Sequence, residues 1–213
     1  MNPETSSKPM PATAPVGGGR DDRELVAAAK GGERSAFDEL VVRHQDKVFN
    51  MSYRILGDRE EALDCSQEIF LSAYRGLQRF DDKARFGTWL YRITVNRCRD
   101  QIRRRGFRKY TRPISLDAAG PDQESEGGLE PAARESTPLE RASTDERTRL
   151  VNAALQELPG DAREILLLRD LQGLSYEEVA EILEVPIGTV RSRLSRARGL
   201  LRERLLPILE GEA

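Results

Sequence analysis

The sequence predicts an all-α protein of two small helical domains joined by a flexible acidic linker. Three observations lead to this prediction. Apolar residues recur at helical spacing through most of the chain, no segment alternates as a β-strand would, and residues 114–144 replace the pattern with Gly, Pro, Ser and acidic residues. A composition of 38% hydrophobic and 33% charged residues with one Trp favours two modest cores over a single deep one.

The first domain is expected over residues 21–110. Residues 1–20 are rich in Pro, Gly, Ser, Thr and Ala and cannot bury enough apolar surface to offset chain entropy, so we expect a disordered tail there. A short helix should run from near Asp21 to the pair Gly31 and Gly32, because glycine is conformationally permissive and ends helices.

Two longer helices are expected next. Ser35 and Asp38 resemble a capping box at the start of the second helix, and Gly57 ends that helix. Asp58 begins the third helix, which reaches about Phe80 and carries an apolar stripe on one face. Each helix should therefore bury one face against the others.

A fourth helix, from about Thr88 to Arg105, carries two different faces at helical spacing. The inward face is predicted to consist of Tyr91, Val95, Cys98 and Ile102. The outer face presents an aromatic ring, an amide and three guanidinium groups: Trp89, Arg92, Asn96, Arg99 and Arg103. Such a face predicts contact with an anionic partner.

The basic run from Asn96 to Arg112 strengthens this prediction. It holds eight Arg or Lys residues and one acid, Asp100, and such a block neutralises phosphates. Aromatic residues just upstream, beside arginines, are typical of stacking on unpaired bases, which suggests single-stranded DNA. Taken alone, Trp89 could equally be a core anchor, and Tyr91 is better interpreted as core.

The linker is expected over residues 111–144, the second domain over 145–207 and a short tail over 208–213. A helix should run from near Asp145 until Pro159 and Gly160 stop it. Further helices are expected at Glu164–Leu171, from Ser175 and from near Pro186.

The last two helices form a predicted helix-turn-helix. Ser175 and Glu178 form a capping box, and Pro186 breaks the first helix after about nine residues. In the second helix an apolar stripe, Val190, Leu194, Ala197 and Leu201, is flanked by arginines that suit guanine edges and phosphates. A merely solvated basic helix is the alternative interpretation.

No catalytic, metal or cofactor site can be assembled from these residues, so the chain is not expected to be an enzyme. Its one histidine, His44, lies in an apolar stripe and is expected to be structural, and Cys65 and Cys98 are expected to be reduced core thiols. The sequence has no phosphate-binding glycine loop, membrane span or signal peptide, which predicts a soluble cytoplasmic protein. The net charge of −2 averages blocks of opposite sign.

Two groups of motifs resemble the extracytoplasmic-function sigma factors. Residues 64–70 (DCSQEIF) and 86–96 (FGTWLYRITVN) resemble the second conserved region of that family. Four segments resemble the fourth conserved region of the family: Leu158-Pro159 and residues 166–170 (LLLRD), 173–180 (GLSYEEVA) and 186–193 (PIGTVRSR). The resemblance covers about residues 21–110 and 145–206, in the family's order.

The resemblance implies a subunit that binds the beta and beta-prime subunits of core RNA polymerase, directs the enzyme to promoters and helps to open the duplex. Asp64, Gln67 and Glu68 match positions that dock on the polymerase clamp helices, although from the residues alone this acidic face is typical of solvation. Because many relatives are held inactive by an anti-sigma factor, often in responses to stress, one is expected as a further partner. No cofactor or metal is implied.

The resemblance also implies where promoter DNA binds, both melted and double-stranded. Contacts with the minus-10 element, where a base is flipped into a pocket, are expected from Leu77, Phe80, Trp89, Arg92, Ile93, Asn96, Arg99 and Arg103. Contacts with the minus-35 element are expected from Thr189, Arg191, Ser192, Arg193, Ser195, Arg196 and Arg198. Ser195 replaces an aromatic residue often found there, which predicts a weaker thymine contact.

Two alternatives remain from other classes of protein. A two-domain regulator of the response-regulator type would use the helix-turn-helix as a dimeric operator-binding domain, and it would need a receiver domain whose alternating strands this sequence lacks. A stand-alone RNA-binding or scaffold protein held together by its basic run would leave the helix-turn-helix unexplained.

Overall fold

The computed structural model of the chain describes residues 20–111 and 148–210, and every element in them is helical, as predicted. The elements are α1 (Asp22–Lys30), α2 (Arg34–Leu56), α3 (Arg59–Gly76), η1 (Leu77–Arg79), α4 (Phe86–Thr111), a helical segment over 148–156, α6 (Gly160–Leu166), η2 (Leu167–Leu171), α7 (Tyr176–Leu183) and α8 (Ile187–Glu210). The expected tails and linker lie outside the described residues, apart from Arg20, Thr111 and residues 208–210.

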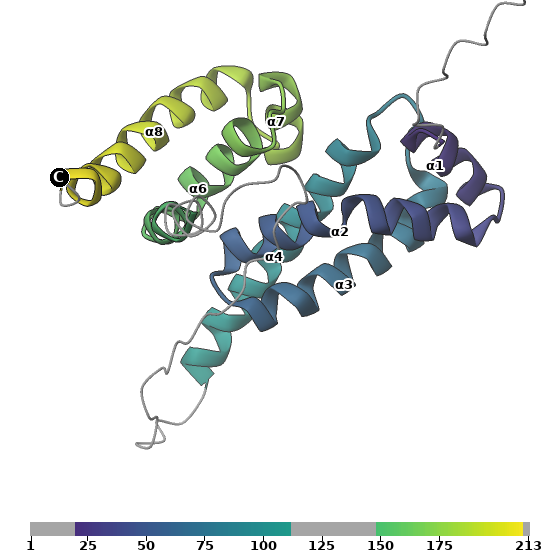
Figure 1. Ribbon diagram of the computed structural model, residues 1–213, viewed down its shortest axis with the longest axis horizontal. Helices are drawn as coiled ribbons and strands as arrows, with labels where there is room; N and C mark the ends of the chain where they lie inside the picture. Colours follow the sequence, from purple (N-terminus) through teal and green to yellow (C-terminus); the bar gives the residue numbers. More distant parts are fainter. Residues whose placement is uncertain (1–19, 112–147, 211–213) are drawn as a thin grey trace, which may run out of the picture.

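The N-terminal domain is a bundle of α2, α3 and α4, with α1 packed at one end (Figure 1). Asp21 caps α1 in a reciprocal capping box with Glu24, and Asp58 caps α3 by accepting a hydrogen bond from the Glu61 amide. Gly57 ends α2 in the left-handed region, with φ 76°, which glycine adopts without a steric cost. The start of α3 at Asp58 and the end of α2 at Gly57 were correctly predicted, whereas the capping box of α1 was not predicted.

The start of α2 was wrongly predicted. Ser35 lies inside its first turn and donates to Glu33 Oε1 at 3.1 Å, and Glu33 is the N-cap residue, without a side-chain cap bond. The cause is the end of α1, where Gly32 adopts φ 98° and the Glu33 amide bonds to the Ala28 carbonyl at 3.0 Å. This Schellman-type closure carries the chain straight from Glu33 into the next helix.

The fourth helix, α4, is longer than predicted at both ends. Of its predicted inward face, Tyr91, Val95 and Cys98 are buried, whereas Ile102 is 42% exposed. The prediction for Ile102 was wrong because periodicity specifies which face a residue occupies and not how far the neighbouring helices extend along it.

The C-terminal domain contains the segment 148–156, α6, η2, α7 and α8. The second predicted helix starts earlier than expected, because α6 begins at Gly160, directly after Pro159. The capping box of α7 is present as predicted: the Ser175 amide bonds to Glu178 Oε2 at 2.8 Å and the Glu178 amide bonds to Ser175 Oγ at 3.1 Å. The long α8 continues away from the N-terminal domain (Figure 1).

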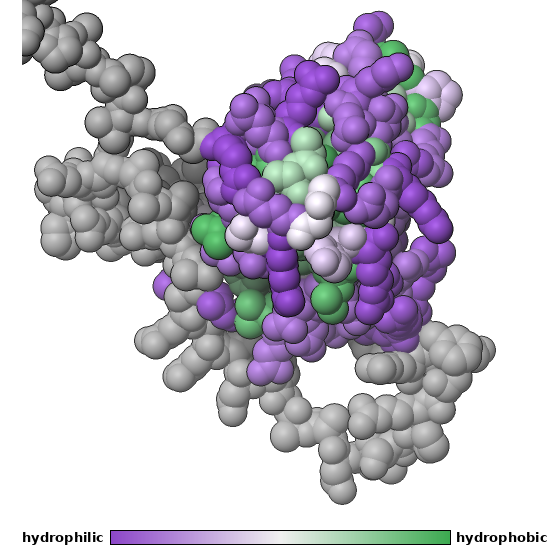
Figure 2. Space-filling model, turned by 90° about the vertical axis from the view of Figure 1, so that its right-hand side faces the viewer, coloured by the Kyte–Doolittle hydropathy of each residue, from purple (hydrophilic) through white to green (hydrophobic). Residues whose placement is uncertain are grey.

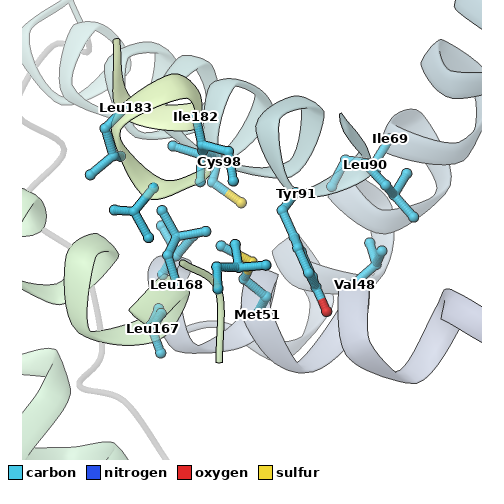
Figure 3. Close-up of a cluster of buried hydrophobic side chains, with 14 of the residues drawn as sticks. Val48, Met51, Ile69, Leu90, Tyr91, Cys98, Leu167, Leu168, Ile182 and Leu183 are labelled. Atoms are coloured by element: carbon cyan, nitrogen blue, oxygen red, sulfur yellow. The ribbon is translucent and has the colours of Figure 1, made fainter. Parts of the chain in front are cut away.

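The prediction of two separate cores was wrong. Buried side chains of both domains form one contiguous cluster, which includes Met51 and Tyr91 of the N-terminal domain and Leu168, Ile182 and Leu183 of the C-terminal domain (Figure 3). Burial raises the pKa of Tyr91 to about 12, and its hydroxyl donates to Gln172 Oε1 of the C-terminal domain at 2.5 Å. Periodicity identifies the apolar face of each helix but not the helix that will cover it.

Remaining predictions about single residues agree with the structure. His44 is buried, with its Nε2 2.7 Å from Asp22 Oδ2, so the histidine has a structural partner. Cys65 and Cys98 are buried free thiols whose Sγ atoms lie 3.9 Å apart.

The face of the molecule in Figure 2 is largely hydrophilic, with isolated apolar residues. Each helix in the described part of the chain is too short or too polar to span a bilayer.

Candidate nucleic-acid interface

Three aromatic rings gather at the start of α4. The ring centroids of Phe80 and Phe86 lie 4.9 Å and 5.7 Å from that of Trp89, and 6.0 Å from each other. Gly76 permits this close approach, because a Cβ atom there would lie 3.3 Å from Cζ2 of Trp89. Rings at such distances stabilise one another, so the neighbours of Trp89 fix its position.

A cavity of about 280 Å³ lies beside these rings. Arg79, Phe80, Trp89 and Arg92 line it from the N-terminal domain, and Glu181 and Ile182 of α7 supply a further wall. Its volume is close to the lower end of the roughly 300–1,000 Å³ typical of small-ligand sites. Aromatic rings and guanidinium groups together suit the binding of a planar base. Trp89 therefore has two roles, since it packs against Phe80 and Phe86 and also lines the cavity.

The other predicted minus-10 residues occupy different environments. Asn96 is exposed, and Arg103 is exposed and paired with Asp100 at 2.5 Å. Ile93 is half-buried. Leu77 is only 2% exposed and belongs to the core, so it supports the surface from beneath.

Two arginines of the same face are bound to the C-terminal domain. Arg92 Nη2 donates to Glu184 Oε1 at 2.6 Å, and Arg99 holds Glu164 through Nε and Nη2 at 2.6–3.2 Å. The hydrogen bonds to Glu164 raise the pKa of Arg99, so the guanidinium stays charged. Sequence reasoning predicted this basic face correctly but did not predict that the chain's own carboxylates would occupy it.

The outer face of α3 carries the expected polar residues in one row. Asp64, Gln67 and Glu68 are all exposed. Leu71 and Tyr74 are 55% and 52% exposed and continue the row at helical spacing. Sequence reasoning missed these two residues, although their spacing from Gln67 was the signal that could have identified them. The face is therefore an acidic row that ends in an apolar patch.

The helix-turn-helix consists of α7, a turn and α8. Of the predicted apolar stripe of α8, Val190, Leu194 and Ala197 are buried and Leu201 is half-buried. The opposite face exposes Arg191, Ser192, Ser195, Arg196 and Arg198, and Thr189 and Arg193 are half-buried. This arrangement turns a row of hydroxyl and guanidinium groups outward, as on a helix that enters a major groove.

Neighbouring side chains position two of these arginines. The centroid of the Tyr176 ring lies 4.9 Å from Cζ of Arg169 and 5.9 Å from Cζ of Arg191, so the ring contacts both guanidinium groups. Asp170 binds Arg198 at 2.6 and 2.9 Å, and this hydrogen bonding raises the pKa of Arg198. Sequence reasoning assigned no role to Tyr176 or Asp170, because contacts between α7, η2 and α8 depend on the tertiary fold.

Two family models match the chain in the order of its domains. The model of Sigma-70 region 2 matches residues 40–108, and that of Sigma-70, region 4 matches residues 148–201. The first match contains α3 and the start of α4, and the second contains the helix-turn-helix.

Curated relatives match over nearly their whole length. The chain is 39% identical to the RNA polymerase sigma-H factor of Pseudomonas aeruginosa over 88% of this chain and 95% of that protein. It is 37% identical to the ECF RNA polymerase sigma-E factor of Escherichia coli over 88% of this chain and 96% of that protein.

Solved structures of similar fold include two complexes. CnrH, solved with the cytosolic domain of CnrY, matches with a TM-score of 0.62 and 26% identity, over 90% of this chain and 99% of that one. The sigma factor RpoE of Bartonella quintana, solved with the anti-sigma factor NepR, matches with a TM-score of 0.61 and 25% identity, over 79% of this chain and 96% of that one.

Proposed function

Because the chain belongs to the sigma-70 family, and within it to the extracytoplasmic-function sigma factors, we propose that it binds core RNA polymerase, directs it to specific promoters and promotes opening of the DNA. The observation that carries this proposal is the presence in one chain of two different surfaces whose chemistry suits DNA. One surface pairs aromatic rings with a cavity and arginines, and the other is a helix-turn-helix. Such a protein would act in the cytoplasm and would catalyse no reaction of its own.

The row on α3 is proposed to dock on the polymerase. Asp64, Gln67 and Glu68 are exposed and offer carboxylate and amide groups to basic and polar partners. Leu71 and Tyr74 extend the same face, and exposed apolar side chains beside polar ones are typical of a protein interface. We therefore include these two residues in the proposed docking surface.

The start of α4 is proposed to bind the melted minus-10 element. A base flipped from the non-template strand would enter the cavity beside Phe80 and Trp89, where stacking would offset part of the few kcal/mol that unstacking costs. Arg92 would contact the strand at the cavity wall, and Asn96 and Arg99 would contact it outside the cavity. Leu77 would act indirectly by supporting η1 from the core.

The exposed row on α8 is proposed to contact the minus-35 element. Arg191, Ser192 and Arg196 lie on the face opposite the buried stripe and can reach base edges or phosphates. Tyr176 and Asp170 would hold Arg191 and Arg198 in place before DNA binds, which reduces the entropy lost on binding. Thr189, Arg193 and Ser195 complete the proposed surface.

An anti-sigma factor is proposed as a further partner. Two solved structures of the same fold are complexes with another protein, and in one of them the other protein is named as an anti-sigma factor. A protein of that kind would compete with polymerase for the surfaces of both domains.

Runoff transcription with sigma-free core polymerase on a promoter library tests the proposed function. We expect transcripts from a subset of promoters when the chain is added and none above background with core polymerase alone. If the chain supports no initiation but binds a palindromic duplex unaided, it is a dimeric regulator and the proposal is wrong.

A further inference from the structure

The loop between η1 and α4, residues 80–85, forms part of the wall of the cavity beside Trp89. Phe80, Asp81 and Ala84 of this cavity loop line the cavity, so the course of the loop decides the shape of the wall. Phe80 is buried, whereas every residue after it in the loop is exposed. Burial of side chains therefore fixes the start of the loop but not the rest of it.

Lys30, in the last turn of α1, binds the cavity loop at two points. Its ammonium group donates to the Phe80 carbonyl at 2.7 Å and to Asp82 Oδ1 at 2.7 Å. The same group lies 5.6 Å from the centroid of the Phe80 ring, within the range of a cation–π contact. One side chain thus holds the backbone of the first residue of the loop and a side chain two positions later.

The helix that carries Lys30 is itself fixed next to the loop. α1 packs on α2, η1 and α4, and its Leu25 and Val26 are buried. Gln78 Nε2 of η1 donates to the Lys30 carbonyl at 3.0 Å, so the end of α1 and η1 are linked in both directions. A lysine in the last turn of a helix also interacts favourably with the helix dipole, but the dipole alone does not explain two hydrogen bonds to another element. Lys30 is therefore an anchor between two elements.

The exposed part of the cavity loop is a compact turn. The Lys83 amide donates to Asp81 Oδ1 at 3.0 Å, and the Ala84 amide donates to the Asp81 carbonyl at 2.9 Å. Lys30 attaches this turn to α1 through Asp82, which lies inside it. Release of Asp82 would therefore allow the turn to move as a unit, and two residues of the cavity wall would move with it.

We infer that Lys30 is a positioning residue that sets the selectivity of the cavity for the base that enters it. This inference rests on the proposed function, because it requires that an unpaired minus-10 base enters the cavity. Phe80, Asp81 and Ala84 form the wall, and Lys30 acts through them by holding the loop in one place. A pocket for a flipped base selects by shape and by hydrogen bonds, and both depend on where its wall lies.

Two single substitutions release the loop and change the net charge in opposite directions. Lys30→Met removes the ammonium group but keeps an unbranched side chain, and Asp82→Ala removes the carboxylate but leaves the Phe80 carbonyl bonded to Lys30. Lys30→Arg keeps a positive charge with N–H donors and is the conservative variant. The matched control is Lys47→Met, which removes the same charge from an exposed position on α2.

Runoff transcription by the holoenzyme measures the selectivity. The templates derive from one promoter active in the runoff assay, and each carries a different base at one position of the minus-10 or minus-35 element. Selectivity at a position is the ratio of the rate with the preferred base to the rate with the next best base. We expect Lys30→Met to lower this ratio about fivefold at one minus-10 position and Asp82→Ala to lower it about twofold there. Lys30→Arg should recover most of the ratio, and Lys47→Met should match the wild type.

A residue that only stabilises the fold would lower the rate on all templates and leave every ratio unchanged, and this result would overturn the inference. An equal fall at the minus-35 positions, or in Lys47→Met, would also overturn it. So would a ratio that falls in Lys30→Met but rises in Asp82→Ala, because opposite changes indicate an effect of net charge on DNA binding.

Thermal unfolding verifies that each variant is folded. If Lys30→Met does not fold, Asp82→Ala decides the question, since the Asp82 side chain is 59% exposed and an unchanged ratio in that variant contradicts the inference. Failure of the wild type to support runoff transcription would instead overturn the proposed function.

Discussion

Replacing Arg163 should weaken the contact between the domains and lower the stability of the whole fold. Its guanidinium group donates to four backbone carbonyls at 2.5–3.1 Å: Leu155, Gln156, Leu158 and Ile55. Partial removal of the guanidinium group from water lowers the pKa of Arg163. Arg163→Met keeps much of the side-chain volume but leaves these carbonyls without their donor.

The expected loss follows from the number and exposure of these carbonyls. A buried polar group left without a partner costs about 1–3 kcal/mol of stability. Hydrogen bonds to charged groups also make larger net contributions to stability than hydrogen bonds between neutral groups. Arg163 is half-exposed, so water can replace some of the bonds. We therefore expect Arg163→Met to lower the free energy of unfolding by about 3 kcal/mol.

Urea denaturation followed by circular dichroism measures this loss. Arg163→Lys is the matched control, because an ammonium group keeps the charge but lacks the planar fork that reaches four acceptors. It should recover about half of the lost stability. A loss below about 1 kcal/mol for Arg163→Met, or full recovery with lysine, would refute the reasoning.

Four further predictions concern single side chains. Leu168→Ala, at a fully buried position, should lower stability by about 3 kcal/mol in the same urea assay, and a loss below about 1 kcal/mol would contradict the single shared core. Burial alone would raise the pKa of Asp22, but hydrogen bonds from His44 and Arg43 outweigh it and hold the pKa below 3.8. The wild-type protein should therefore be more stable than Asp22→Asn above pH 3.8, and this difference in the free energy of unfolding should shrink as the pH falls below 3.8. Arg196→Ala should weaken recognition of the minus-35 element by roughly 1–3 kcal/mol in a competition assay with holoenzyme, and an unchanged preference would exclude it as a contact. Asn96→Ala should impair promoter opening and relax the preference at one base near the start site, whereas equal losses at both elements would remove that assignment.

The elements of the fold were largely predictable because their signals are local. Asp21, Asp58 and Ser175 cap helices as their side chains suggest, and Gly57 ends one by adopting a positive φ. The buried stripe of α8 followed directly from its spacing. Ser35 failed as a cap because the end of the preceding helix, and not its own chemistry, decided where α2 starts.

The relation between the domains was not predictable from the same signals. Glu164 sits in a sequence that suggests an ordinary helix, yet it is buried and bound to Arg99. Likewise, Tyr91 was correctly predicted to be buried, but its hydroxyl donates to Gln172, which lies 81 positions later in the chain. Periodicity shows which face of a helix is apolar, whereas the identity of its partner depends on contacts that form only in three dimensions.

Permanganate footprinting of a promoter selected in the runoff assay tests the central claim most directly. Core polymerase with the wild-type chain should make thymines around the start site reactive, and core polymerase with Trp89→Ala should bind the promoter but leave those thymines much less reactive. Thymines that stay unreactive with the wild-type chain, or that react equally with core polymerase alone, would contradict the account.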